Sequence, residues 1–260
     1  MSERPEASLD ETRKMKLQYL GDSKDAFKWD YLDFLVKSLN MGSKEYKLLV
    51  VPMLTDSDNT KQGQTDPSEF SSSKEVQKFC VYLQNKRELK KIKELSSYTN
   101  SDYDIYIHKE KCHEKEEWFV NNDSFRRTYF PNISKGGKTV LFLDPDKGFE
   151  TKHLKNTKEH HVKYCDIKNI YNDAKKDDII VVFQHAPHNI PFPFREKYKD
   201  IVRKLTEKDI QCDKTALFWC NQVMFVIIGK SSELINKIRK MNESYQKLPR
   251  PVEVIRGDAG

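Results

Sequence analysis

The chain of 260 residues is polar, with 33% charged and 37% hydrophobic residues and a mean hydropathy of −0.80, yet its 14 Phe, 12 Tyr and 3 Trp exclude a disordered chain. Its length suits one ordinary α/β domain or at most two small ones, and no apolar run approaches the ~18 residues that a transmembrane helix needs. The net charge of +6, from 46 Lys and Arg against 40 Asp and Glu, is a mild excess that leaves open both a polyanionic partner and simple solvation.

The first residues and the cysteines indicate the compartment. Residues 1–16 are charged and lack the apolar segment of a secretory signal. The five cysteines, at positions 80, 112, 165, 212 and 220, are odd in number and form no CxxC pair, which is typical of free thiols in a reducing compartment. We therefore expect a cytoplasmic protein, with 1–16 as a flexible lead-in, 17–248 as a single α/β domain and 249–260 as a flexible tail.

The first half of the chain contains two predicted helices and two predicted strands. Apolar residues recur every three or four positions over 25–39 and 74–95, which predicts amphipathic helices, the first capped by Asp22 or Ser23. Residues 46–54 form a short apolar run typical of a strand buried on both faces, and 104–108 is a shorter strand candidate. The polar segment 55–73 is rich in turn formers, so we expect a loop that is mobile or poorly packed unless a ligand is bound.

Further strands and helices alternate in the second half. Two more buried strands are predicted over 139–143 and 178–183. Helices are predicted over 162–174, 195–208 and 231–241. Two strand-like runs, ALFWC and VMFVIIG, are separated only by Asn221 and Gln222, which indicates a hairpin. Buried strands that alternate with helices favour a three-layer α/β fold with a mainly parallel, Rossmann-like sheet and a C-terminal antiparallel hairpin.

Polar clusters follow three of the predicted buried strands. In open α/β sheets ligands bind beyond the carboxyl ends of the strands. If the three strands are parallel, these clusters meet at one edge of the sheet and form a candidate site. The residues concerned are Asp56 and Asp58 after the first strand, Asp144, Asp146 and Glu150 after the second, and Gln184 and His185 at the end of the third.

The segment DPDKGFE, residues 144–150, has three readings. Its carboxylates could hold Mg²⁺ or Mn²⁺, which prefer oxygen ligands, or could accept hydrogen bonds from an amine or a ribose hydroxyl. It could equally be an ordinary Asp-Pro turn. His185 is a candidate general base or a hydrogen-bonded structural residue. Neither GxGxxG nor GxxxxGK[ST] occurs in the chain.

A resemblance rests on the N-terminal helix. Gly21, Asp25, Lys28 and Leu32 form the pattern GxxxDxxKxxxL, which resembles the N-terminal stretch of the 23S ribosomal RNA adenine methyltransferases of the RlmJ type. Asp144-Pro145 matches the first half of that family's Asp-Pro-Pro-Tyr motif, and the predicted closing hairpin resembles the end of class I methyltransferase sheets. A closer resemblance is to proteins of unassigned activity that share GDxxDxxK and DPDxG[LF]E.

The resemblance implies a methyltransferase-like fold, S-adenosylmethionine near Lys28 and a target amino group held at Asp144. The chain departs from the family where Asp146 and Lys147 replace Pro and Tyr, and where LTDSDNTKQG replaces the glycine-rich cofactor loop.

Three hypotheses about function follow. The first is a methyltransferase-fold enzyme that transfers a methyl group from S-adenosylmethionine to a nucleic acid, with Asp144 on the acceptor and Lys28, Asp56 and Asp58 on the cofactor. The second is a nuclease or phosphodiesterase that holds Mg²⁺ or Mn²⁺ on Asp144, Asp146 and Glu150, with His185 or Lys152 to serve the attacking water. The third is a non-catalytic relative that binds nucleic acid or a protein. Taken together, the candidate catalytic residues are Asp144, Asp146, Glu150 and His185, and the candidate cofactor-binding residues are Asp25, Lys28, Asp56 and Asp58. No hypothesis includes a membrane partner.

Overall fold

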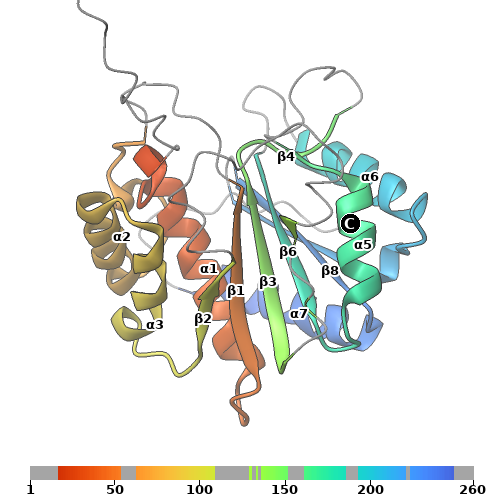
Figure 1. The fold of residues 1–260 in the computed structure, drawn as a ribbon, viewed down its shortest axis with the longest axis horizontal. Coiled ribbons are helices and arrows are strands. Elements are labelled where there is room, and N and C mark those ends of the chain that lie inside the picture. The colour runs from red at the N-terminus through yellow and green to blue at the C-terminus, as the bar shows by residue number, and fades with distance from the viewer. Residues whose placement is uncertain are drawn as a thin grey trace, which may run out of the picture.

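A computed structural model describes residues 17–53, 63–108, 129–130, 133, 136–151, 161–185, 193–220 and 223–248. A six-stranded sheet lies between two layers of helices (Figure 1). In spatial order its strands are β2 (Ile105–Ile107), β1 (Tyr46–Met53), β3 (Lys138–Pro145), β6 (Ile179–His185), β8 (Val223–Gly229) and β7 (Thr215–Cys220). The first four are parallel to one another, and β8 is antiparallel to both of its neighbours. The predicted fold class is confirmed.

The central strands β1, β3 and β6 lie side by side, as their apolar composition predicts. Val50 of β1 is paired with Phe142 of β3, and Phe142 with Val181 of β6. Side chains of a strand alternate between the two faces of a sheet. Both faces are covered here, and so these strands are apolar throughout rather than alternating between apolar and polar residues.

Each face of the sheet has its own hydrophobic core. Val50, Phe142 and Val181 belong to the core under α1 (Ser23–Leu39), α2 (Lys74–Lys86), α3 (Leu95–Tyr98) and α7 (Ser232–Gln246). Val51 and Val182 belong to the core under α5 (Tyr164–Asp173) and α6 (Pro193–Thr206). In the described part of the chain no helix is both long enough and apolar enough to cross a bilayer.

Helix α1 is buried on most sides, and an aromatic cluster ties it to the C-terminal elements. The ring of Tyr31 stacks on Phe218 of β7 at 4.3 Å and on Phe225 of β8 at 4.8 Å, measured between centroids. Tyr245 of α7 meets the same ring edge-on at 5.5 Å. The Tyr31 hydroxyl donates a hydrogen bond to Asn242 at 2.8 Å, so its polar end is also satisfied inside the core.

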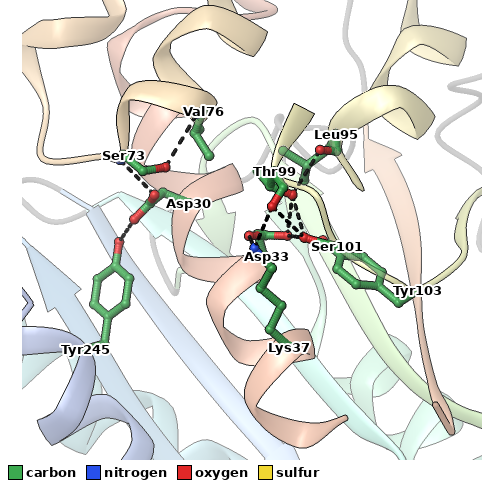
Figure 2. A network of polar contacts seen from close by, with 10 residues as sticks. All are labelled: Asp30, Asp33, Lys37, Ser73, Val76, Leu95, Thr99, Ser101, Tyr103 and Tyr245. Atoms are coloured by element: carbon green, nitrogen blue, oxygen red, sulfur yellow. Dashed lines mark hydrogen bonds and ion pairs between the residues drawn. The ribbon is translucent and has the colours of Figure 1, made fainter. Parts of the chain in front are cut away.

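Two buried carboxylates connect α1 to its neighbours, as Figure 2 shows. One oxygen of Asp33 accepts hydrogen bonds from three hydroxyl groups, those of Thr99, Ser101 and Tyr103. The other oxygen of Asp33 lies 3.0 Å from the ammonium of Lys37. Asp30 accepts from the backbone N–H of Ser73, which begins α2, and from the hydroxyl of Tyr245. Because every contact is a hydrogen bond or an ion pair, these carboxylates can be buried without a large desolvation penalty.

The helix predicted over 74–95 is interrupted. Helix α2 ends at Lys86, Arg87 adopts a left-handed φ of 50°, and the chain continues as the 3₁₀ helix η3 (Leu89–Glu94) and α3. The Arg87 guanidinium donates to the backbone carbonyls of residues 17, 18 and 20. These long-range hydrogen bonds stabilise the left-handed conformation of Arg87. The sequence does not indicate this conformation, because the position has neither a glycine nor a proline.

The polar segment after β1 is more ordered than its composition predicts. Residues 54–62 lie outside the described part, as do the expected lead-in 1–16 and tail 249–260. Within 63–73, however, Gly63, Pro67, Ser71 and Ser72 are buried, and Asp66 caps the short 3₁₀ helix η2 (Pro67–Glu69). The prediction of poor packing is therefore wrong for these buried positions, whereas the other residues of 63–69 are exposed. The two-residue strands β4 (Gly148–Phe149) and β5 (His161–Val162) form a small separate sheet that is too short to predict.

Candidate functional site

A pocket of about 660 Å³ lies at the carboxyl ends of β1, β3 and β6, beside the first turns of α1. Met53, Pro145 and His185, the last residues of these three strands, all line it. This is the edge where parallel α/β sheets bind ligands. We call it the Lys28 pocket, after the charged residue at its centre.

The lining of the Lys28 pocket has an apolar part and a charged part. The apolar part comes from several elements: Leu17, Tyr19, Leu20, Trp29, Val50, Met53, Leu89, Ile92 and Phe183. The charged part comes from the start of α1 and from the turn after β3: Asp22, Lys24, Asp25, Lys28, Asp144, Asp146 and Lys147. A mostly apolar pocket with a few grouped polar side chains is typical of a small-molecule site.

The Lys28 ammonium joins α1 to the end of β3. Its Nζ lies 2.6 Å from Asp25 Oδ1 and 3.0 and 3.1 Å from the two carboxylate oxygens of Asp144. The same Nζ lies 4.7 Å from the centroid of the Phe183 ring. Burial by itself lowers the pKa of Lys28, but Asp144, Asp25 and Asp22 outweigh burial and raise it above its ordinary value. Lys28 is therefore charged at neutral pH.

A tight turn before α1 sets the positions of Asp22 and Asp25. Asp22 is the N-cap and accepts a hydrogen bond from the Asp25 N–H at 2.8 Å, while Asp25 Oδ2 accepts from the Gly21 N–H at 2.8 Å. Gly21 has a φ of +85°, and a Cβ there would collide with the carbonyl oxygen of Cys80 in α2. Only glycine fits this turn, which aligns both carboxylates with Lys28.

Negative charge exceeds positive charge around Lys28. Three carboxylates, those of Asp22, Asp25 and Asp144, lie around the Lys28 ammonium. With Asp146, Lys24 and Lys147 the lining has four carboxylates and three ammonium groups. Burial first, and the charge of Asp25 second, raise the pKa of Asp22 to about 6. Burial likewise raises the pKa of Asp144, although Lys28 opposes the increase. A positively charged group that enters the pocket would relieve this repulsion.

The side chain of Gln184 anchors the turn that presents Asp144 and Asp146. Its Oε1 accepts from the Phe149 N–H at 2.8 Å, and its Nε2 donates to the carbonyl oxygens of Lys147 at 3.3 Å and His185 at 2.7 Å. Gly148 has a φ of +90°, and a Cβ there would collide with Gln184. The end of β6 therefore holds the turn after β3 in place.

His185 completes the edge of the pocket as a neutral side chain. Burial, followed by the positive charges of Lys24 and Lys28, lowers its pKa to about 4, against an opposing effect of Asp146. Its ring packs edge-on against Phe183 with centroids 4.8 Å apart. At neutral pH the imidazole can thus accept a proton or a hydrogen bond.

The structure brings together most of the candidate residues that it describes. Asp25, Lys28, Asp144, Asp146 and His185 all line the Lys28 pocket. Glu150 does not: its Oε1 accepts from the Tyr164 N–H at 2.8 Å, at the start of α5. The shared cleft expected for all of them therefore excludes Glu150, because the chain turns at Gly148 and carries Glu150 toward α5. Asp56 and Asp58 lie outside the described residues.

Two features of the pocket are not evident from the sequence. Asp22 suggests only a helix cap, because neither its burial nor its closeness to Asp25 and Lys28 is encoded in local spacing. The sequence indicates that Trp29, beside Asp25 and Lys28, is an exposed aromatic, but this is wrong because the structure buries it. Its side chain lines the pocket, and its buried Nε1 has no hydrogen-bond partner among the described residues. A buried donor without a partner is unfavourable unless a ligand or water satisfies it.

The charged groups do not fit a divalent metal. In the described ranges no group of three or more His, Cys, Asp or Glu side chains is placed to hold a metal ion. Lys28 Nζ occupies the position between Asp25 and Asp144 that a cation would need, and Glu150 caps α5 instead. The ammonium therefore already neutralises part of the carboxylate charge that a metal would use.

Comparisons with known proteins add no relatives. No family model matches the chain, and neither the curated proteins nor the solved structures contain a significant match.

Proposed function

We propose that this chain is a methyltransferase-fold enzyme that binds S-adenosylmethionine in the Lys28 pocket and methylates an amino group of a nucleic acid. The observation that carries the proposal is the excess of carboxylates over ammonium around Lys28, at the ligand-binding edge of the sheet. S-adenosylmethionine has a sulfonium and an ammonium group, so its positive charges complement this excess.

The order of the strands supports the same proposal. Strand β8 lies between β6 and β7 and runs antiparallel to both. This is the closing hairpin for which the sequence resembles class I methyltransferases. Because one fold can host many activities, the residues of the pocket support the proposal more strongly than the strand order does.

The lining residues have distinct proposed roles toward the cofactor. Asp22 and Asp25 would attract its positive charges, and the unpartnered Nε1 of Trp29 would donate a hydrogen bond. When bound, S-adenosylmethionine supplies an electrophilic methyl group. Asp56 and Asp58 remain predicted cofactor residues on the segment that follows β1.

Other residues would act on the acceptor. Asp144 and Asp146, at the end of β3, would accept hydrogen bonds from the amino group and orient it. His185 is neutral at physiological pH, so a ring nitrogen would accept a hydrogen bond from the amino group, while its low pKa makes it a weak acceptor of the proton that the group loses. Positioning of this kind supplies most of the rate enhancement when a reaction needs an in-line approach more than a strong acid.

The metal-dependent nuclease has less support, because Lys28 occupies the space between the carboxylates and Glu150 lies elsewhere. We place the methyltransferase in the cytoplasm, consistent with the free thiols of Cys80, Cys165 and Cys212.

Calorimetric titration with S-adenosylmethionine and with S-adenosylhomocysteine, which lacks the sulfonium charge, tests the proposal. We expect the sulfonium compound to bind on the order of tenfold more tightly, as one favourable charge interaction at a partly buried site allows. Asp144→Asn should abolish transfer of a tritiated methyl group to unmodified RNA while the fold is retained. Glu150→Gln, outside the pocket, is the matched control and should retain transfer. A folded wild-type protein that binds neither compound would refute the proposal.

A further inference from the structure

One short segment of the chain is basic and lies beside the Lys28 pocket. Residues 74–98, which form α2, η3 and α3, contain seven basic and three acidic residues, a net charge of +4 out of +6 for the whole chain. This segment covers one side of the layer that includes α1 (Figure 1). This part of the surface is therefore positively charged.

The basic residues of α2 form a row. Lys74, Lys78, Tyr82 and Lys86 are each four positions apart, so they follow one line along the helix at steps of about 6 Å. The opposite side of α2 is buried through Val76, Phe79, Cys80 and Leu83. All three lysines are exposed, and none has a carboxylate partner among the described residues. We call the row, together with Tyr98, the basic strip.

Two of the three acidic residues in the segment are already paired. Glu88 lies 3.0 Å from Lys90, and Glu94 lies 2.8 Å from Lys91. These carboxylates therefore neutralise lysines of η3 rather than those of the row. The positive charge of Lys74, Lys78 and Lys86 remains available to an outside anion.

Aromatic rings interrupt the basic strip. Tyr82 and Tyr98 are in contact, with centroids 5.6 Å apart and planes inclined by 32°. Tyr98 is 36% exposed, and about half of the neighbouring Val81 is exposed as well. The Lys91 ammonium lies 5.8 Å from the Tyr82 ring. The half-buried Tyr82 thus lies in the row of lysines, and the exposed Tyr98 packs beside it. Aromatic rings beside lysines are what proteins use to stack unpaired bases while binding phosphates.

We propose that the basic strip binds single-stranded nucleic acid, with Lys74, Lys78 and Lys86 on phosphates and Tyr98 against a base. This inference rests on the proposed function, for which it names the surface that holds the substrate. The two regions adjoin, because Leu89 and Ile92 of η3 line the Lys28 pocket from the same segment. A strand bound along α2 thus passes beside the pocket. A single strand is favoured over a duplex because stacked base pairs cannot offer a free face to Tyr98.

Fluorescence anisotropy with a labelled 12-nucleotide RNA tests the strip directly. The triple variant Lys74→Gln/Lys78→Gln/Lys86→Gln should weaken binding at least tenfold and lower the slope of log Kd against log salt by about 2, since each phosphate contact on a single strand contributes about 0.7. The matched control Lys237→Gln/Lys240→Gln/Lys247→Gln removes the same charge from exposed positions on α7 and just after it, and should change Kd less than threefold. Tyr98→Leu, which keeps apolar volume, should weaken binding roughly fivefold or more through lost stacking.

Each further result would either support the proposal or overturn it. Binding of S-adenosylmethionine to the triple variant should equal that of wild type, so loss of RNA binding with intact cofactor binding supports the strip independently of the pocket. Equal losses in the α7 control would mean that only net charge matters and would overturn the proposal. Tighter binding of a duplex, or of inorganic polyphosphate of equal charge, would also overturn it.

Discussion

Replacement of Asp22 by Asn measures how much unneutralised charge the Lys28 pocket contains. Burial and the neighbouring Asp25 raise the pKa of Asp22 from 3.8 to about 6. A tenfold change in proton affinity between the folded and unfolded chain is worth about 1.4 kcal/mol, so the ionised form of Asp22 destabilises the fold by up to about 3 kcal/mol.

The sign of the pH dependence follows from the direction of this change. The folded chain holds the Asp22 proton more tightly than the unfolded chain, so the contribution of Asp22 to stability falls as the pH rises from about 4 to about 6. Asn is uncharged at every pH and caps a helix about as well as Asp. We expect Asp22→Asn to be more stable than wild type by up to about 3 kcal/mol at about pH 7.5, and equally stable near pH 3.5.

Urea unfolding of both proteins, followed by tryptophan fluorescence from about pH 3.5 to about pH 8, provides the assay. His185 has the opposite effect: its lowered pKa makes stability rise between about pH 4 and 6.5. This effect is present in both proteins and cancels in their difference. A constant difference across the pH range, or a variant less stable at about pH 7.5 by more than about 1 kcal/mol, would show that Asp22 is an ordinary ionised cap.

Substitutions at three further positions test the contacts that build the fold and the site. Asp33→Ala removes the acceptor of three hydroxyl groups and should lower the free energy of unfolding by about 3 kcal/mol. Asp33→Asn keeps one acceptor oxygen and should lower it by about half as much. The midpoint of denaturation measures both losses. Gln184→Ala leaves the buried Phe149 N–H without its acceptor, so it should cost about 2 kcal/mol and weaken cofactor binding in the same protein, as calorimetry would show. Gly148→Ala should destabilise by at least about 1 kcal/mol through its positive φ and its collision with Gln184. In the double variant with Gln184→Ala the combined loss should be smaller than the sum of the two, and an additive loss would argue against the collision.

The fold could be predicted because its central strands carry a strong local signal. Strands β1, β3 and β6 are short apolar runs between turn formers, and the hairpin is marked by two residues between two runs. The break at Arg87 could not be predicted, because it depends on carbonyl groups about seventy residues earlier in the chain. The burial within 63–73 could not be predicted for a similar reason: glycine and serine carry no apolar signal, although Ser71 and Ser72 are buried and Gly63 packs against Gln18 and Tyr19.

The candidate site could be predicted in part from where strands end. Asp144, Asp146 and His185 follow from the rule that parallel strands share a carboxyl edge. Lys28 was placed by resemblance alone, because its helix precedes the sheet and no spacing indicates which edge it faces. Glu150 was included on its closeness in sequence to Asp146, yet a single glycine turn is enough to separate two neighbours in space. Asp22 could not be assigned, because its importance comes from burial among other charges.

The packing of Tyr31 has a consequence for how the chain is made. Its ring is covered by Phe218, Phe225 and Tyr245, which are translated almost two hundred residues after it. Until they leave the ribosome, α1 has an uncovered aromatic surface and β6 has an open edge. Such long sequence separation between contacting residues slows folding and exposes intermediates to aggregation. A chain that stops before the hairpin should therefore be a substrate for chaperones and proteases, whereas changes to the surface of α5 should not delay folding in this way.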